Sequence, residues 1–441
     1  MRKFLALILT PLALLAGCGG SGTSHSGPPP PPPPPPTQVI ATPGPPNAET
    51  LVVDEGPTAL TVPAVNTAFI SVKVCMPDGT FANCQTIDHV EVDTGSIGLR
   101  IIAGGASAGQ LTLSLPPVPD PNNANNVLAE CLQFADGFSW GSVNTADISL
   151  PISGETATNV IVHVIGATSA GNPANANPSC VPPPPLVTEN TVPSFGANGI
   201  LGVGPFINDC NSFGNCTGTG SAIYYGCTAA ASCAKTTVQL AQQLPNPAKL
   251  FATDNNGVIV ELPPVGDTGT VEPLQGTLVF GIGTQSNNGL GGATKLLMCD
   301  GSTNQGICGL NGQALAGTVS ATLNGTTYAA SYLDSGSNAN FFPTSIPSCP
   351  QPNQGFLCPA STTSENAMLQ GTDGTVLAAD FNVANANSLF SPTPCTPNCL
   401  VAFSNLTGDG AGSPDSLDLG LSFFFGRNVF TGIEPGPYFA Y

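Results

Sequence analysis

Basic residues are scarce in this chain. Its 441 residues include only eight Lys and Arg and three His, against 27 Asp and Glu. Such an acidic protein repels nucleic-acid phosphate, so we expect no nucleic-acid partner. The scarcity also limits positive self-repulsion once the carboxylates become protonated, which favours stability in acid.

Long apolar runs and helical patterns are missing as well. Beyond the N-terminus no apolar stretch is long enough to cross a membrane, and only residues 238–244 look clearly helical. The sequence is rich in Gly, Pro, Asn, Thr and Val, which predicts a mainly β protein. About 390 residues follow the Pro-rich segment, which is more than a single hydrophobic core usually supports. We therefore predict two lobes, residues 61–283 and 284–441.

The N-terminus has the pattern of a bacterial export signal. Two basic residues precede the apolar run 4–16, and residues 15–18 read Leu-Ala-Gly-Cys. This ending resembles the lipobox of bacterial lipoproteins, which implies removal of residues 1–17 and lipidation of Cys18. Gly19 resembles the sorting pattern for the outer membrane of Gram-negative bacteria. We expect an exported, membrane-anchored protein of the cell envelope; a simply cleaved signal peptide is the alternative.

Residues 18–60 are expected to form a disordered tether. Residues 19–50 consist largely of Gly, Ser, Pro and Thr, with nine consecutive prolines at 28–36. A proline run adopts stiff polyproline II and cannot form a core. A spacer between membrane and domain is favoured over a ligand for a proline-binding module.

Cysteines, by contrast, are numerous. Of the fifteen, fourteen remain if Cys18 carries lipid, and an even number in an exported protein predicts disulfides. No CxxC spacing occurs and no His clusters with these cysteines, so a zinc site is the weaker alternative. The short spacings predict Cys75/Cys84, Cys210/Cys216, Cys227/Cys233, Cys299/Cys308, Cys349/Cys358 and Cys395/Cys399, leaving Cys131 to pair with Cys180.

Two Asp-containing motifs share one pattern. Residues 90–96 read Val-Glu-Val-Asp-Thr-Gly-Ser and residues 331–337 read Ser-Tyr-Leu-Asp-Ser-Gly-Ser, each a strand pattern leading into a turn. One such motif is weak evidence, because Asp-Thr-Gly is an ordinary turn sequence. Two motifs, one per expected lobe, indicate a functional pair; two turn aspartates are the alternative. The candidate residues are Asp93 and Asp334, supported by Thr94, Gly95, Ser96, Ser335, Gly336 and Ser337.

The chemistry of peptide hydrolysis explains why two acids matter. Two close carboxylates cannot both ionise, so the pair shares one proton. The ionised group then acts as general base on a water molecule, and the protonated group polarises the scissile carbonyl. No metal or cofactor is required.

The motifs and four further segments resemble those of pepsin-like aspartic proteases, in the family's order. The resemblance extends from about Asn66 to the C-terminus. The four segments are the flap hairpin over the substrate (134–141 and 147–150), the hydrophobic-hydrophobic-Gly element behind the first Asp loop (199–204), a helix and strand (238–244 and 276–281), and the second Gly element (417–424).

This resemblance implies a bilobal, mainly β fold with few short helices and a cleft between the lobes. It implies that Thr94 and Ser335 hold the two loops together, and that Ser96 and Ser337 hydrogen-bond the outer carboxylate oxygens. The expected flap and substrate-binding residues are Phe134, Asp136, Gly137 and Phe138.

The sequence departs from the family pattern at the flap. The usual Tyr is Phe134, the following Gly is Ala135, and the Trp often found after the first motif is Arg100. The Tyr–Trp hydrogen bond that supports the flap therefore cannot form. These departures and the long Cys-bearing insertions suggest a bacterial branch known mainly as a domain of unknown function.

The predicted function is that of a monomeric aspartic endopeptidase of the cell envelope acting on a peptide or protein. A catalytically inactive surface lipoprotein that binds a peptide or glycan in its cleft is the alternative, because folds host many functions. His89 and His163 are interpreted as structural. A serine hydrolase would need a His-Asp partner, which nothing in the sequence identifies.

Overall fold

The computed structural model describes most of the chain beyond the Pro-rich segment. The described residues are 38–104, 109–167, 180, 187–210, 216, 223–228, 232–300, 315–391, 400–410 and 412–441. The predicted signal peptide, Cys18 and the proline run lie outside them. The predicted disordered tether over residues 18–60 is wrong in its second half, because residues 48–53 form a strand paired within the main sheet. Residues 38–441 form one compact unit, and the lobe boundary predicted within it, after residue 283, stays a prediction.

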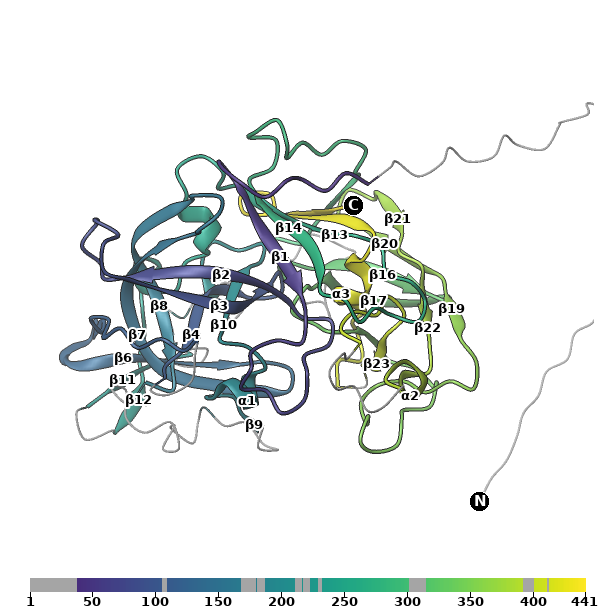
Figure 1. Cartoon of the computed structure of the whole chain (residues 1–441), viewed down its shortest axis with the longest axis horizontal. Helices are drawn as coiled ribbons and strands as arrows, with labels where there is room; N and C mark the ends of the chain where they lie inside the picture. The colour runs from purple at the N-terminus through teal and green to yellow at the C-terminus, as the bar shows by residue number, and fades with distance from the viewer. Residues whose placement is uncertain are drawn as a thin grey trace, which may run out of the picture. The chain divides into compact units, whose positions relative to one another are not determined.

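A large mainly antiparallel sheet contains strands from both ends of the chain (Figure 1). Its strands are β1 (Ala48–Val53), β2 (Ala68–Cys75), β3 (Cys84–Asp93), β4 (Ile97–Ile102), β5 (Pro119–Asp120), β6 (Asn123–Gln133), β7 (Gly137–Ser149), β8 (Thr156–Ile165), β9 (Val187–Thr188), β10 (Gly199–Val203), β11 (Tyr224–Cys227), β12 (Cys233–Lys235), β13 (Gly257–Leu262), β14 (Leu274–Phe280), β15 (Lys295–Leu297), β25 (Arg427–Gly432) and β26 (Tyr438–Ala440).

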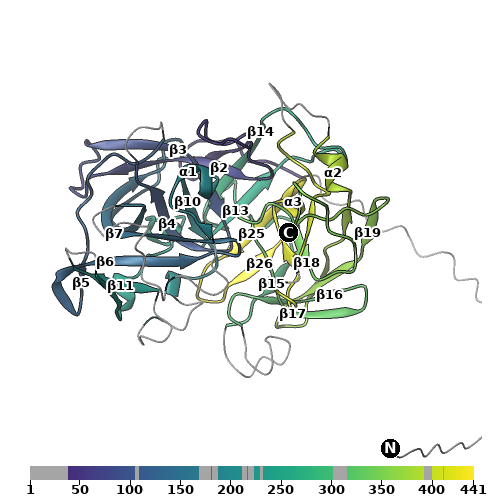
Figure 2. The same cartoon turned by 90° about the horizontal axis from the view of Figure 1, so that it is seen from below.

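A smaller sheet and a separate strand pair lie in the second half of the sequence. The sheet contains β16 (Val319–Leu323), β17 (Thr326–Leu333), β18 (Asn340–Phe342), β20 (Ala367–Gln370), β21 (Val376–Ala378), β23 (Thr407–Asp409) and β24 (Asp418–Leu419); the pair is β19 (Thr363–Glu365) with β22 (Phe381–Val383). Figure 2 shows β3, β4 and β10 grouped apart from β16, β17 and β18. We call the parts around these groups the first and second lobe. The mainly β, two-lobed prediction is confirmed.

The helices are short. They are α1 (Val192–Phe195), α2 (Ala386–Leu389), α3 (Leu421–Phe424) and the 3-10 turns η4 (Leu240–Gln242) and η5 (Pro247–Leu250). The prediction of a helix over 238–244 is wrong, since that segment contains only η4. Its flanking residues Gln239 and Gln243 are extended, and Pro245 disfavours helix at the residue before it. In the described part of the chain, no helix is long and apolar enough to span a membrane.

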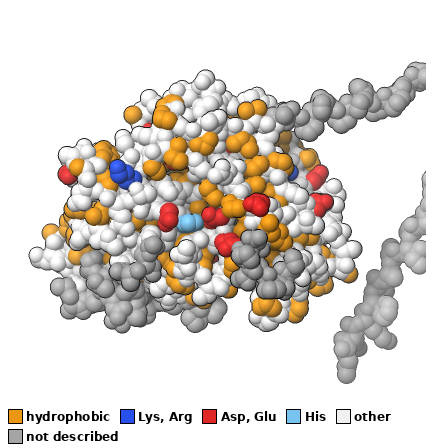
Figure 3. Space-filling model, viewed as in Figure 1, with side chains coloured by type: hydrophobic (Ala, Val, Ile, Leu, Met, Phe, Trp, Pro, Cys, Tyr) orange, Lys and Arg blue, Asp and Glu red, His pale blue; other side chains and the backbone are white. Residues whose placement is uncertain are grey.

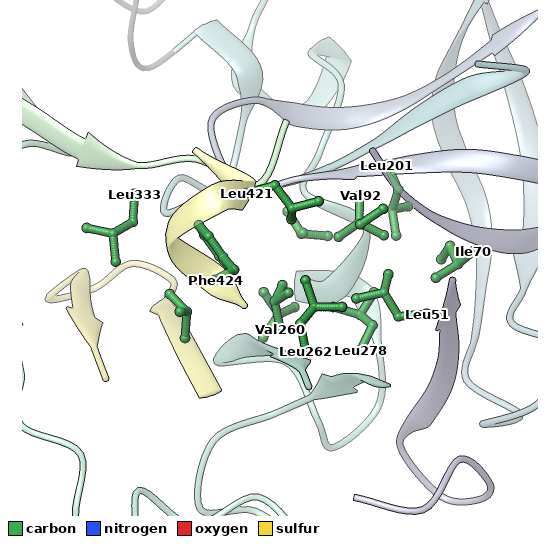
Figure 4. Packing of buried hydrophobic residues seen from close by; sticks show 14 of the residues in the cluster. Leu51, Ile70, Val92, Leu201, Val260, Leu262, Leu278, Leu333, Leu421 and Phe424 are labelled. Carbon is green, nitrogen blue, oxygen red and sulfur yellow. The ribbon is translucent and has the colours of Figure 1, made fainter. Parts of the chain in front are cut away.

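One hydrophobic core runs from the first lobe to the second. β1, β14, β13 and β25 pair antiparallel in that order, so the beginning and end of the described chain share one sheet. Buried Leu51 on β1 and Val92 on β3 belong to the same cluster as Leu333 on β17 and Phe424 on α3 (Figure 4). Burial of this apolar surface stabilises β3 and β17, the two strands that lead into Asp93 and Asp334.

Most of the disulfides close short loops, as predicted. Five of the expected pairs are present: Cys75–Cys84, Cys131–Cys180, Cys210–Cys216, Cys227–Cys233 and Cys349–Cys358. Cys299 is also disulfide-bonded, but its expected partner Cys308 lies outside the described residues, as do Cys395 and Cys399.

Candidate active site

The two motifs occupy equivalent places in the two lobes. β3 ends at Asp93 and pairs in parallel with β10, which pairs antiparallel with β4. β17 ends just before Asp334 and pairs in parallel with β24, which pairs antiparallel with β18. The same three-stranded arrangement therefore presents each acid at the end of a buried strand.

The predicted Gly elements pass directly behind the two Asp loops. A Cβ atom added to Gly202 on β10 would lie 2.6 Å from the backbone nitrogen of Ile97. One added to Gly420, which follows β24, would lie 2.5 Å from the carbonyl oxygen of Ser337. Both distances are too short for any side chain, so only glycine fits at these crossings.

Asp93 and Asp334 meet between the lobes. Their carboxyl groups hydrogen-bond to each other, and burial, followed by the charges of Asp93 and Asp418, raises the pKa of Asp334 well above its ordinary value. The backbone N–H of Gly95 donates to Asp93 Oδ1 at 2.6 Å, and that of Gly336 to Asp334 Oδ1 at 2.8 Å. A Cβ atom on either glycine would strike the opposite carboxyl group.

Thr94 and Ser335 connect the loops by four reciprocal hydrogen bonds. Thr94 Oγ1 donates to the carbonyl of Leu333 (3.1 Å) and accepts from the N–H of Ser335 (2.9 Å). Ser335 Oγ donates to the carbonyl of Val92 (2.7 Å) and accepts from the N–H of Thr94 (3.1 Å). All these groups are buried, so the contact holds the two acids at a fixed separation.

The outer serines differ between the lobes. Ser337 Oγ lies 3.1 Å from Asp334 Oδ2, as the family resemblance implied, and 2.6 Å from Asp418 Oδ2. Ser96 Oγ is buried and has no hydrogen-bond partner among the described residues, so the same expectation for Asp93 is wrong. The hydrogen bonds made by Thr94 and Ser335 are therefore equivalent in the two loops, whereas those of the outer serines Ser96 and Ser337 differ.

The two acids open into a cavity of about 720 Å³. Its walls include the segment from Leu60 to Thr67, which connects β1 with β2, and Phe195 of α1. Figure 3 shows acidic side chains grouped near the middle of the face it displays. The described residues lining this cavity include no Lys, Arg or His.

The flap residues divide into two groups. Phe134 and Asp136 line the cavity, and the ring of Phe134 packs edge-on against Phe195 with centroids 5.8 Å apart. Phe138 does not line it: only 3% exposed, it packs with Trp140 and other residues in a separate cluster, so its predicted substrate contact is wrong. Gly137 is absent from the lining as well, and its lack of a side chain makes room for Glu189.

Sequence reasoning missed four acids in the cavity wall: Asp409 and three acids whose pKa is raised. Burial raises the pKa of Glu189 to about 8, and the charge and hydrogen bond of Asp136 add to that rise. The pKa of Glu91, two residues before Asp93, lies well above its ordinary value because of burial and neighbouring carboxylates. Asp418 is the third. Glu91 and Asp418 both lie in segments with an otherwise apolar pattern, which is the signal that could have revealed them.

Arg100 belongs to a buried polar network in the first lobe. Its guanidinium lies 2.6 Å from Glu130 and 3.4 Å from Asp209, and Glu130 lies 3.1 Å from His163. Arg100, Glu130 and His163 have no exposed surface. Tyr224 donates to Asp209 at 2.8 Å. Arg100 therefore contributes to the interior of the first lobe.

No metal site emerges from the described residues. They contain no group of three or more His, Cys, Asp or Glu side chains arranged to hold an ion.

The fold and the paired Asp loops define a protein of the pepsin-like fold class. The structure is similar to the crystal structure of an aspartic proteinase from Irpex lacteus, with a TM-score of 0.50, 14% identity, and coverage of 89% of this chain and 96% of that chain. At this identity the likeness concerns the fold alone. The chain belongs to the family described as "Protein of unknown function (DUF3443)", which matches residues 43–441. A search of curated proteins finds no match.

Proposed function

We propose that this protein is an aspartic endopeptidase. The observation that carries the proposal is the hydrogen-bonded pair of Asp93 and Asp334 at the floor of a cavity, one acid from each lobe. Two carboxyl groups that share a proton supply both a general base and a general acid at a single site.

In this mechanism a water molecule binds between the two acids and the substrate peptide crosses the cleft above them. The ionised carboxylate takes a proton from the water, whose oxygen attacks the scissile carbonyl carbon. The other carboxyl group donates its proton to the carbonyl oxygen, and a tetrahedral diol forms. Proton transfer to the amide nitrogen and cleavage of the C–N bond release two peptides. The raised pKa of Asp334 favours it as the initial proton carrier, although the titration belongs to the pair.

The same proposal includes the location and partners of the protein. Lipidated Cys18 anchors a monomer in the outer membrane of a Gram-negative bacterium, and the proline-rich tether holds the catalytic unit away from the lipid. A peptide or protein substrate enters from the solvent.

A binding protein without turnover is the second candidate. It is favoured by Phe134, which places no hydroxyl at the flap tip, and by Arg100, which lies within the lobe interior instead of supporting the flap. Both changes weaken the features that normally exclude water from the pair.

Turnover separates the two candidates. The purified protein is mixed with unfolded casein or a peptide library from pH 2 to pH 8, with and without a statine-containing peptide. A peptidase releases new N-termini at acidic pH and is inhibited by the statine peptide. No cleavage at any pH, together with retained binding of the peptide, would contradict the proposal and support the second candidate.

A further inference from the structure

Asp418 occupies a position that is apolar in the first lobe. On β10, Ile200 lies beside Glu91 of β3 and Arg100 of β4. On β24, Asp418 lies in the equivalent register, beside Tyr332 of β17 and Phe341 of β18. The second lobe therefore has an acid at the position where the first lobe has a hydrophobic residue.

Ser337 connects this acid to the catalytic pair. Its Oγ lies 2.6 Å from Asp418 Oδ2 and 3.1 Å from Asp334 Oδ2. A hydroxyl group has a single hydrogen, so it donates to one of the two carboxylates at a time. Asp418 is only 7% exposed, it lines the cavity, and its Oδ1 has no hydrogen-bond partner within the described structure.

Among the described residues, the groups around Asp418 offer no compensating positive charge. Asp334 and Tyr332 face it from the second lobe and Asp93 from the first. Burial raises the pKa of Asp418 to about 8; the hydrogen bond from Ser337 opposes that rise and the charge of Asp93 adds to it. The pKa of Tyr332 is raised too, with the charge of Asp418 as its largest cause.

We propose that Asp418, acting through Ser337, is a positioning residue that keeps the shared proton on Asp334 to higher pH. The proposal rests on the function proposed above. Asp418 itself ionises near pH 8; above that pH it takes the hydroxyl hydrogen of Ser337 and places a second negative charge near Asp334. Both changes disfavour the ionised form of Asp334, so the pair keeps its proton.

The test follows the titration of Asp334 directly. ¹³C-labelled aspartate carboxyl signals are recorded against pH in the full protein, and Asp334→Asn assigns the signal. Asp418→Asn removes the charge with little change of shape, and Asp418→Ile reproduces the residue of the first lobe. In both variants the midpoint of Asp334 should fall by about one pH unit, and the alkaline limb of kcat/KM should move down with it. Asp409→Asn, which removes a carboxylate elsewhere in the cavity wall, should leave the midpoint unchanged.

A second comparison tests the role of Ser337. In a Ser337→Ala background, Asp418→Asn should shift the midpoint by less than half as much, because the shared hydrogen is gone. An unchanged Asp334 midpoint in both Asp418 variants, or an equal shift with and without Ser337, would overturn the inference. If the wild-type protein cleaves no substrate, the proposed function fails, yet the carboxyl titration still decides whether Asp418 controls Asp334.

Discussion

The two Asp loops make the same central hydrogen bonds, but the strands next to them, β10 and β24, carry different side chains. Thr94 and Ser335 exchange the same four hydrogen bonds in opposite directions, and each loop is crossed by a glycine that no other residue could replace. Duplicated backbone geometry thus fixes the two carboxyl groups. Residues that do not touch the opposite lobe are free to differ.

The difference lies in one row of side chains across three strands. In the first lobe, the row has Ile200 at its centre and the buried base Arg100 at one end. In the second lobe, the centre is the acid Asp418 and the end is Phe341. The two rows therefore place different ionisable groups around the pair, and, besides burial and the charge of Asp93, the charge of Asp418 contributes to the raised pKa of Asp334.

Removing Arg100 should have the largest effect on stability. Arg100→Met leaves the buried carboxylate of Glu130 without its base, and an uncompensated buried charge costs about 3–5 kcal/mol. The matched change in the other lobe, Phe341→Leu, should cost about 1 kcal/mol. Urea unfolding with intact disulfides measures both values. Equal losses would contradict the assigned role of the network.

Removing the hydroxyl group of Thr94 and removing that of Ser335 should destabilise the protein by similar amounts. Thr94→Ala and Ser335→Ala each break two buried hydrogen bonds, and each should lower the free energy of unfolding by about 2 kcal/mol. Thr94→Ser and Ser335→Thr keep the hydroxyl and serve as controls, with losses below about 1 kcal/mol. A difference of more than about 1 kcal/mol between the two Ala variants would show that the loops are not equivalent.

Stability should fall as pH rises from 5 to 8. Burial raises the pKa of Glu189 and Asp418 to about 8 and of Glu155 and Glu261 to about 7. The folded state keeps protons that the unfolded state has lost, so stabilisation present below about pH 4 disappears as these groups ionise. His163 opposes this, because burial lowers its pKa to about 4 and costs stability below pH 6.5.

The free energy of unfolding should therefore decrease from pH 5 to pH 8, measured by urea unfolding at each pH. Glu189→Gln in the first lobe and Asp418→Asn in the second should each make this decrease smaller. A free energy of unfolding that increases toward pH 8 would be incompatible with these raised pKa values.

The smallest expected effect concerns the flap tip. Phe134→Ala removes the edge contact with Phe195 and should lower kcat/KM about fivefold, corresponding to roughly 1 kcal/mol. Phe134→Tyr should change kcat/KM less than about twofold, because Arg100 is buried in its own network and no indole supports a hydroxyl. A large gain with Tyr would show that the flap still has a partner for it.

Local sequence was sufficient to predict the centre of the site. Asp93 and Asp334 follow strand patterns and precede tight turns, and both features depend on neighbouring residues alone. Five disulfides were predicted for the same reason, since most of them close short loops. The mainly β composition predicted the fold class.

The features that could not be predicted from the sequence depend on packing between distant segments. Glu189 lies more than fifty residues after the flap residue Asp136, and nothing in either segment shows that they meet. The role of Phe138 depended on its packing with Trp140 inside the lobe, and Pro245 disfavours a helix at the end of residues 238–244. Asp418 was visible as an acid in an apolar element, but only strand register revealed its neighbours.

The most direct test of a single catalytic pair built from both lobes is cleavage by the two single Asn variants. Asp93→Asn and Asp334→Asn are assayed with wild-type protein on unfolded casein at acidic pH, with circular dichroism to verify folding. Loss of either carboxyl group should reduce kcat/KM by about 10³-fold or more, because neither acid can serve as both base and acid. Wild-type cleavage by either folded variant would contradict the account.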